Sequence, residues 1–123
     1  MLTTEQPISH LHRLKSDEIW HFHAGKSITI VEIDHNNVVS RTKLGNDLQA
    51  VMKNEMKVSH TVKAGVWFGS YLNTTENSAF SLVSCTVVPG FEYEDFEVLY
   101  QHDYEDYNVK VPEDLHFMIA MKK

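Results

Sequence analysis

The stretch "SHLHRLKSDEIWHFHAG", residues 9–25, carries four histidines, an acidic pair and a tryptophan within seventeen positions. On an extended strand, side chains two residues apart leave the same face of the sheet. His10 and His12 therefore share one face and can offer two imidazoles to a single ligand or metal. The spacing predicts a strand that presents these histidines to a site.

The second half of this stretch predicts a strand with two different faces. Glu18, Trp20 and Phe22 share one face by the same alternation, and His21 and His23 share the opposite one. With Glu18 facing inward, His21 and His23 point outward, to solvent or to a neighbouring subunit. The four histidines are therefore not expected to form one cluster, and the outward pair is a candidate contact in a homodimer.

Composition limits the class of protein. The 123 residues suit one domain with a single modest core, and we interpret 1–123 as that domain. A net charge of −6 without a dense Lys/Arg cluster argues against nucleic-acid binding. No apolar run approaches the roughly 20 residues of a membrane helix, and the N-terminus lacks a basic-then-apolar signal segment. Cys85 is the only cysteine, so no intrachain disulfide framework is expected. We expect a cytoplasmic protein without membrane or nucleic-acid partners.

Short alternating, β-branched segments recur along the chain, separated by turn signals. The segments that predict strands are 27–33, 38–44, 57–62, 66–72 and 80–88, and residues 47–54 predict a short helix. Residues 112–123 predict a terminal helix, with Pro112 in its first turn and Leu115, Met118 and Ile119 at helical spacing. The pattern indicates an all-β sandwich or barrel on which, or on whose partner subunit, this helix docks.

The residues "HRLKSDEIWHFHAG" resemble the signature H-R-x-x-S-D-E-x-W-H-F of a cupin subfamily known as a domain of unknown function, DUF985. "LGND" near Gly45, "KAGVWF" near Gly65 and residues 82–98 resemble later elements of this subfamily in order. The resemblance covers residues 9–98 and leaves 99–123 as a C-terminal extension. It implies a jelly-roll β-barrel with a pocket at its mouth, usually a dimer, similar in shape to sugar-nucleotide epimerases. Relatives carry more chain before this block, which implies N-terminal strands that are missing or come from another subunit.

The resemblance also bears on metal binding. His10, His12 and Glu18 form a two-imidazole, one-carboxylate set suited to a divalent transition metal such as Fe, Mn, Ni or Zn. The second cupin motif reads P-x-G-x-x-H, and here Phe68 stands at the position of its histidine. We therefore favour a protein without a bound metal. A metal-dependent oxygenase or isomerase using His10, His12 and Glu18 is the alternative.

Acid–base chemistry is the main hypothesis for an enzyme. His12 with Asp17 or Glu18 supplies an imidazole beside a carboxylate, and Tyr71, on one face with Trp67, is a candidate acid, although a barrel-lining aromatic residue is its alternative interpretation. The catalytic candidates are thus His12, Glu18 and Tyr71.

The candidate ligand-binding residues combine aromatic walls with polar groups. They are His10, Arg13, Ser16, Asp17, Trp20, Lys63, Trp67 and Phe68. Together they predict a protein that binds a small polar or sugar-like molecule, with metal-independent sugar or sugar-nucleotide isomerase or epimerase chemistry. A non-catalytic ligand-binding or sensor module is a further alternative.

Overall fold

The computed structural model describes residues 1–90, 93–102 and 104–121. The strands of this part are β1 (Leu2–Thr3), β2 (Ile8–Arg13), β3 (Asp17–Gly25), β4 (Ile28–Ile33), β5 (Val39–Leu44), β6 (Ser59–Val62), β7 (Trp67–Leu72), β8 (Phe80–Val88) and β9 (Glu97–Val98). The helices are α1 (Leu48–Met52) and three 3₁₀ turns, η1 (Tyr93–Asp95), η2 (Tyr104–Tyr107) and η3 (Glu113–Met118).

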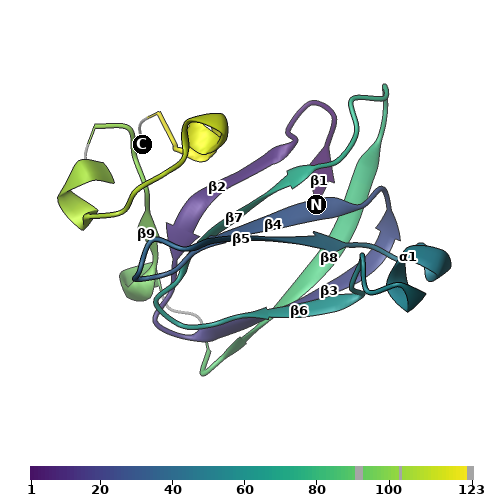
Figure 1. Cartoon of the computed structure of the whole chain (residues 1–123), viewed down its shortest axis with the longest axis horizontal. Coiled ribbons are helices and arrows are strands. Elements are labelled where there is room, and N and C mark those ends of the chain that lie inside the picture. Colours follow the sequence, from purple (N-terminus) through teal and green to yellow (C-terminus); the bar gives the residue numbers. More distant parts are fainter. Residues whose placement is uncertain (91–92, 103, 122–123) are drawn as a thin grey trace.

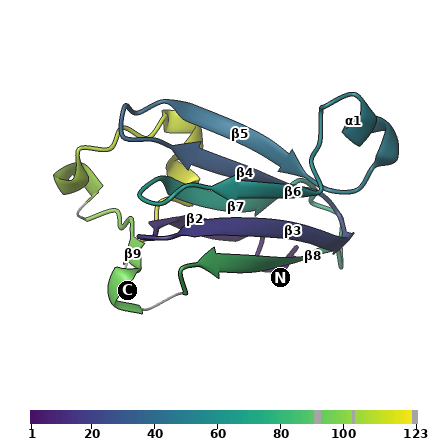
Figure 2. The same ribbon diagram turned by 90° about the horizontal axis from the view of Figure 1, so that it is seen from below.

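The strands form two antiparallel sheets. Sheet A has the order β1-β8-β3-β6, and sheet B has the order β5-β4-β7-β2-β9 (Figure 1). Viewed after a 90° turn, β3 and β8 lie on one side of the molecule and β4 and β5 on the other (Figure 2). This arrangement confirms the predicted all-β, jelly-roll class. The sheets do not close into a complete barrel, although the backbone of Gly45 donates to the carbonyl of Lys57 at 2.9 Å and joins the edges of β5 and β6.

The predicted strands agree with the structure to within two residues at each end. The predicted strand over 80–88 is β8 itself. The predicted helix over 47–54 is α1, and its start is fixed by Asp47, whose Oδ1 accepts from the backbone N–H groups of Gln49 and Ala50 at 3.1 and 3.3 Å. A short polar side chain at this position satisfies amide groups that have no partner within the helix.

One hydrophobic core lies between the two sheets. Alternation along each strand directs every second side chain toward this space. Its buried members are Leu14, Trp20, Ile28, Ile30, Leu44, Val62, Phe68, Leu72 and Ala79. These side chains define the inner face of both sheets.

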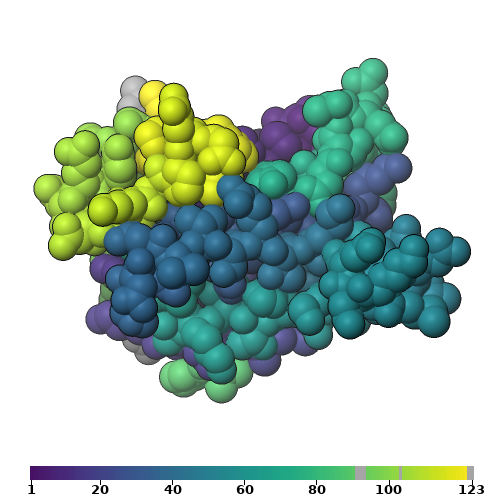
Figure 3. All heavy atoms as spheres, in the orientation of Figure 1, coloured from purple at the N-terminus to yellow at the C-terminus, as the bar shows by residue number. Residues whose placement is uncertain are grey.

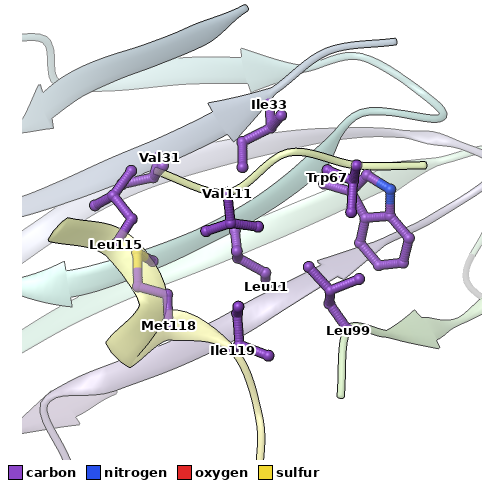
Figure 4. Packing of buried hydrophobic residues seen from close by; sticks show 10 residues of the cluster. Leu11, Val31, Ile33, Trp67, Leu99, Val111, Leu115, Met118 and Ile119 are labelled. Atoms are coloured by element: carbon purple, nitrogen blue, oxygen red, sulfur yellow. The ribbon is translucent and has the colours of Figure 1, made fainter. Parts of the chain in front are cut away.

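A second core lies on the outer face of sheet B, beneath the C-terminal segment. Its buried members are Leu11, Val31, Ile33, Trp67, Leu99, Val109, Val111, Leu115, Met118 and Ile119 (Figure 4). The surface view shows this segment as a continuous cap, in green and yellow, against the blue strands (Figure 3). The predicted docking of Leu115, Met118 and Ile119 on the sheet is thereby confirmed. The segment forms the 3₁₀ turn η3 rather than an α-helix, and residues 122–123 lie outside the described part.

The outer face of sheet A carries the outward-facing histidine pair. His23 Nε2 lies 2.7 Å from Ser84 Oγ, and His21 Nε2 lies 3.3 Å from Thr86 Oγ1. Both rings therefore contact side chains of β8. Their outward direction agrees with the prediction, while their contact with a second subunit remains a prediction. Within the described residues, none of the helices is long and apolar enough to cross a membrane.

Candidate functional site

Six inward-facing side chains from the two sheets form one layer in the middle of the sandwich. Strand pairing sets Trp20 between two neighbours on sheet A and Phe68 between two neighbours on sheet B. The two rows are Cys85, Trp20 and His60, and His12, Phe68 and Glu32. The Trp20 and Phe68 rings meet edge to face with 6.2 Å between their centroids, so the middle of one row contacts the middle of the other.

The layer is closed on one side and open on the other. On the β4–β6 side, His60 Nε2 lies 3.0 Å from Glu32 Oε1, and both side chains are less than one-fifth exposed. Because β3 faces β7 and β6 faces β4, the remaining neighbours β8 and β2 must face each other. Cys85 therefore lies opposite His12. Cys85 is exposed, so this side of the sandwich is its mouth.

A pocket of about 470 Å³ lies along β2 and β9, and its lining includes no residue of sheet A. It is lined by Ser9, His10, His12, Phe96, Val98, Tyr100 and Ala120. His12 also reaches the interior, because its ring centroid lies 4.2 Å from that of Phe68 and 5.3 Å from that of Phe96. We call this space, together with the inner layer behind it, the mouth pocket.

The protonation of His12 is set by its surroundings. His12 Nδ1 lies 2.7 Å from the carbonyl oxygen of His10. A carbonyl only accepts, so Nδ1 carries the hydrogen and Nε2 of the neutral ring carries the free electron pair. Burial lowers the pKa of His12, and the bond to His10 opposes that effect without cancelling it. His12 is thus held as a neutral ring that can accept a proton at Nε2.

Glu18 and Trp20 supply buried polar atoms on sheet A, behind the residues that line the pocket. Burial raises the pKa of Glu18, while the Cys85 thiol and the Trp20 indole act in the lowering direction. Glu18 Oε2 and Trp20 Nε1 are nonetheless buried without a well-formed hydrogen bond to any described residue. A buried polar atom without a partner is costly, and such atoms are commonly satisfied by a ligand or an ordered water. The pair is therefore the strongest sign of a binding site in the structure.

Cys85 is a mouth residue that the sequence did not single out as functional. Although it is exposed, desolvation of the sulfur and the nearby Glu18 carboxylate raise the pKa of the thiol to about 12. The thiolate is the reactive form of cysteine. Cys85 therefore stays a thiol at neutral pH and offers polar contact to Glu18 rather than a nucleophile.

Three predicted site residues lie on the other side of sheet B. Trp67 and Tyr71 face the C-terminal segment, because Phe68, between them in the alternation, faces inward. Arg13 also faces outward, where it makes two bonds to Glu97 at 2.9 and 3.2 Å and lies 4.6 Å from the Trp67 ring. These placements correct the expectation that Arg13, Trp67 and Tyr71 line the pocket of His12. Tyr71 is not placed to act as an acid there.

Three further predicted site residues lie where one strand connects to the next. Asp17 Oδ1 accepts from the backbone N–H of Ala64 at 2.8 Å, and Lys63 Nζ lies 3.8 Å from Asp17 Oδ2. Ser16 is buried in the loop before Asp17. The contacts of Asp17 and Lys63 join the start of β3 to the turn before β7. Ser16, Asp17 and Lys63 are not among the residues lining the pocket; Trp20 and Phe68 are not either, but they lie in the inner layer that His12 contacts.

The three residues of the alternative, metal-dependent hypothesis are not brought together as one set. Between Ser9 and His12, two residues of β2 face the single residue Gly69 of β7, so a bulge breaks the alternation that would align His10 with His12. A Cβ on Gly69 would lie 2.6 Å from the Ser9 carbonyl oxygen, which explains glycine at this crowded point. The described residues contain no group of three or more His, Cys, Asp or Glu side chains placed to hold a metal ion. His10, His12 and Glu18 thus do not form a three-residue metal-binding group in the described structure.

Several mouth residues were missed by sequence reasoning. Phe96, Val98 and Tyr100 show an alternation that is typical of a strand lining a pocket, but they fall where the sequence turns acidic and tyrosine-rich. Ser9 lines the pocket as well and pairs with Ser70 across the strands. The period-two pattern over 96–100 is the sequence signal from which this segment could have been predicted to line the pocket.

The lowered pKa of His12 predicts a pH dependence of stability. Since the folded pKa lies below the ordinary value of 6.5, the unfolded chain takes up a proton that the folded protein does not. The stability contributed by neutral His12 is present above about pH 6.5 and is lost as pH falls through the folded pKa. Urea unfolding measured from about pH 8 to about pH 5 should show this loss, and His12→Gln should make the slope shallower. Equal slopes for the two proteins would contradict the burial of a neutral His12.

Comparisons with known proteins place this geometry in context. A family model described as Cupin superfamily (DUF985) matches residues 1–99. A protein from Shewanella oneidensis with a crystal structure superposes with a TM-score of 0.76 at 34% identity, over 94% of this chain and 68% of that one. A hypothetical protein from Leishmania major superposes with a TM-score of 0.76 at 30% identity, over 98% of this chain and 73% of that one. No match was found among curated proteins.

Proposed function

Since the chain belongs to the DUF985 family of the cupin superfamily, we propose that it binds a small hydroxylated molecule, such as a sugar derivative, in the mouth pocket. The single observation that carries this proposal is the pair Glu18 Oε2 and Trp20 Nε1, which are buried without a well-formed hydrogen bond although the indole lies beside the carboxyl group. An indole N–H only donates, and a carboxylate oxygen accepts. A single hydroxyl group can satisfy both atoms, because it accepts a hydrogen bond from the indole and donates one to the carboxylate.

The remaining walls suit the same class of molecule. Phe96 lies beside His12 in the pocket lining and offers an aromatic face on which the C–H side of a sugar-like ring can pack, while Phe68 is buried behind His12. An apolar pocket with a few placed polar groups is the usual form of a small-molecule site. A pocket of about 470 Å³ lies within the usual range for such a site.

The protonation states support metal-independent proton transfer. His12 projects from sheet B and Glu18 from sheet A, so a bound molecule lies between them. His12 Nε2 takes a proton from a carbon next to a carbonyl group, and the C–H electron pair moves into the carbonyl to form an enolate. The protonated form of Glu18, which the raised pKa makes more populated than in an ordinary carboxyl group, then returns a proton to the other face of that carbon. The step leaves His12 protonated and Glu18 ionised, and it epimerises the carbon.

The proposal is tested by ligand-observed NMR with a panel of sugars, nucleotide sugars and small carboxylic acids. We expect hydroxylated members to bind to the parent protein and to bind more weakly to Trp20→Phe, which removes the indole donor. Incubation of each hit in D₂O then distinguishes an epimerase or isomerase from a binding module. Deuterium incorporation at carbon indicates an epimerase or isomerase, and binding without it indicates a binding module. Binding confined to compounds without hydroxyl groups, or equal binding by Trp20→Phe, would overturn the proposed site.

A further inference from the structure

A second cavity, of about 150 Å³, lies on the outer face of sheet B, where the strand ends meet the C-terminal segment. It is lined by Trp67, a buried residue at one end of the second core (Figure 4). Arg13 also lines it, and residues 107–109 form its wall on the side of the C-terminal segment. We call this cavity the outer pocket. Arg13 and Trp67, two predicted ligand-binding residues that the mouth pocket leaves out, thus meet in a different cavity.

Arg13 presents a positioned guanidinium group to the outer pocket. Its guanidinium carbon lies 4.6 Å from the centre of the Trp67 ring and 5.3 Å from that of Tyr107. Its bidentate bond to Glu97 uses Nε and Nη2, which leaves the N–H groups of Nη1 for another acceptor. A guanidinium held by these contacts loses little conformational freedom when it binds a carboxylate group.

Asp34 presents a carboxylate from the other side of Trp67. β7, which carries Trp67, lies between β2 and β4, and Asp34 directly follows β4. Two strand spacings therefore separate the backbones of Arg13 and Asp34, a distance of about 10 Å. Asp34 Oδ1 accepts from the backbone N–H groups of Asn36 and Val38 at 2.8 and 2.9 Å. These bonds fix the turn after β4 and leave Asp34 Oδ2 for a donor.

The outer pocket has room for a molecule of about the size of alanine. A cavity of about 150 Å³ accommodates benzene, and alanine has the same number of non-hydrogen atoms. A Cβ on Gly65, which also lines the pocket, would meet no atom within 4 Å, so the space beside Gly65 is open.

The charges around the outer pocket limit its ligand further. Because Glu97 already pairs with Arg13, a simple anion would meet the excess negative charge of Glu97 and Asp34. A simple amine would leave the N–H groups of Arg13 Nη1 without an acceptor. A compact molecule with one charge of each sign satisfies both sides of the pocket.

We propose that the outer pocket binds a small α-amino acid of the size of glycine or alanine. Arg13 Nη1 donates to the carboxylate of the ligand, and the ammonium group of the ligand donates to Asp34 Oδ2. The outer pocket and the pocket beside His12 share no lining residue, so this inference does not depend on the function proposed above.

The test follows the Trp67 indole signal in ¹H–¹⁵N NMR spectra during titration with L-alanine. Trp20→Phe leaves Trp67 as the only tryptophan, so its signal is unambiguous. Propionate, which lacks the ammonium group, and ethylamine, which lacks the carboxylate, are titrated in parallel. We expect L-alanine to shift the signal saturably and to bind about tenfold more tightly than either probe, as expected for a lost charge-assisted hydrogen bond.

Asp34→Asn tests the acidic side of the pocket. Its amide oxygen can still accept from the backbone of the turn, whereas the charge is lost. This variant should bind L-alanine about tenfold more weakly than the parent. Asp114→Asn is the matched control, because Asp114 pairs with Arg41 at 3.0 Å and does not line the outer pocket. It should bind L-alanine like the parent.

Three results would overturn the amino-acid site. The first is an indole signal of Trp67 that L-alanine does not shift. The second is an affinity for propionate or ethylamine equal to that for L-alanine. The third is equal binding of L-alanine by Asp34→Asn and Asp114→Asn. The comparison of the three probes needs no change at Asp34, so it decides the proposal even if Asp34→Asn does not fold.

Discussion

Replacing Leu115 with alanine should lower the free energy of unfolding by about 2–5 kcal/mol, the usual cost of deleting a buried leucine side chain. Leu115 is 2% exposed and packs in the core that η3 forms with the outer face of sheet B (Figure 4). That face already carries Val31 and Ile33, which would be open to water without the C-terminal segment. Urea unfolding followed by circular dichroism measures the change.

Glu113→Ala is the matched control on the same 3₁₀ turn. Glu113 is exposed, so its truncation should change the free energy of unfolding by about 0.5 kcal/mol or less. If Leu115→Ala unfolds at the same urea concentration as Glu113→Ala, the C-terminal segment is not part of the folded core. Ligand binding in the mouth pocket should survive Leu115→Ala in protein that remains folded.

Replacing Glu18 with glutamine should weaken ligand binding by about 10- to 100-fold, since hydrogen bonds to charged groups contribute about 1.5–3 kcal/mol. The same change should leave stability at pH 7 unchanged or raised. Because the folded pKa of Glu18 lies above its ordinary value, ionisation of Glu18 opposes folding once pH rises through that pKa. Glutamine removes the desolvated charge and keeps the shape. Weaker binding with no loss of stability distinguishes a ligand contact from a structural one.

Glu32→Gln is the control within the same layer. Glu32 also faces inward, but its carboxylate is satisfied by His60 at 3.0 Å. This variant should therefore lose about 1–3 kcal/mol of stability and keep its affinity for ligand. If Glu18→Gln instead loses stability and keeps its affinity, as Glu32→Gln is expected to do, Glu18 is a structural residue. Calorimetric titration and urea unfolding of both variants make the comparison.

The strands were predictable because their sequence signals are local. Turn residues such as Asn37, whose φ of 61° lies in the left-handed region, mark the ends of alternating segments. The positions of β4, β5 and β8 followed from these signals, and the cupin class followed from the block over residues 9–98.

Which side chains of β7 point toward the inner core could not be predicted from the residues of β7 alone. Sheet B is buried on both faces, so "VWFGSYL" reads as an apolar run without a clear inner side. Trp67 and Phe68 are neighbours and cannot both face one pocket, and only the packing of residues 99–120 shows that Trp67 faces outward. The alternation expected between His10 and His12 failed for a different reason: the bulge opposite Gly69 adds one residue to β2, although both histidines line the pocket.

The most direct test of the ligand site is the ¹H–¹⁵N NMR spectrum of the two tryptophan indoles during titration with a hydroxylated hit. Trp20 Nε1 lies beside Glu18 without a well-formed hydrogen bond, whereas Trp67 packs on the outer face of sheet B, with its ring 5.0 Å from that of Tyr107. Trp20→Phe assigns the two signals. We expect the Trp20 indole proton to move downfield as it donates to the ligand, while the Trp67 signal stays in place. A ligand that binds and shifts Trp67 alone, or shifts neither indole, would contradict a binding site between the sheets at Glu18 and Trp20.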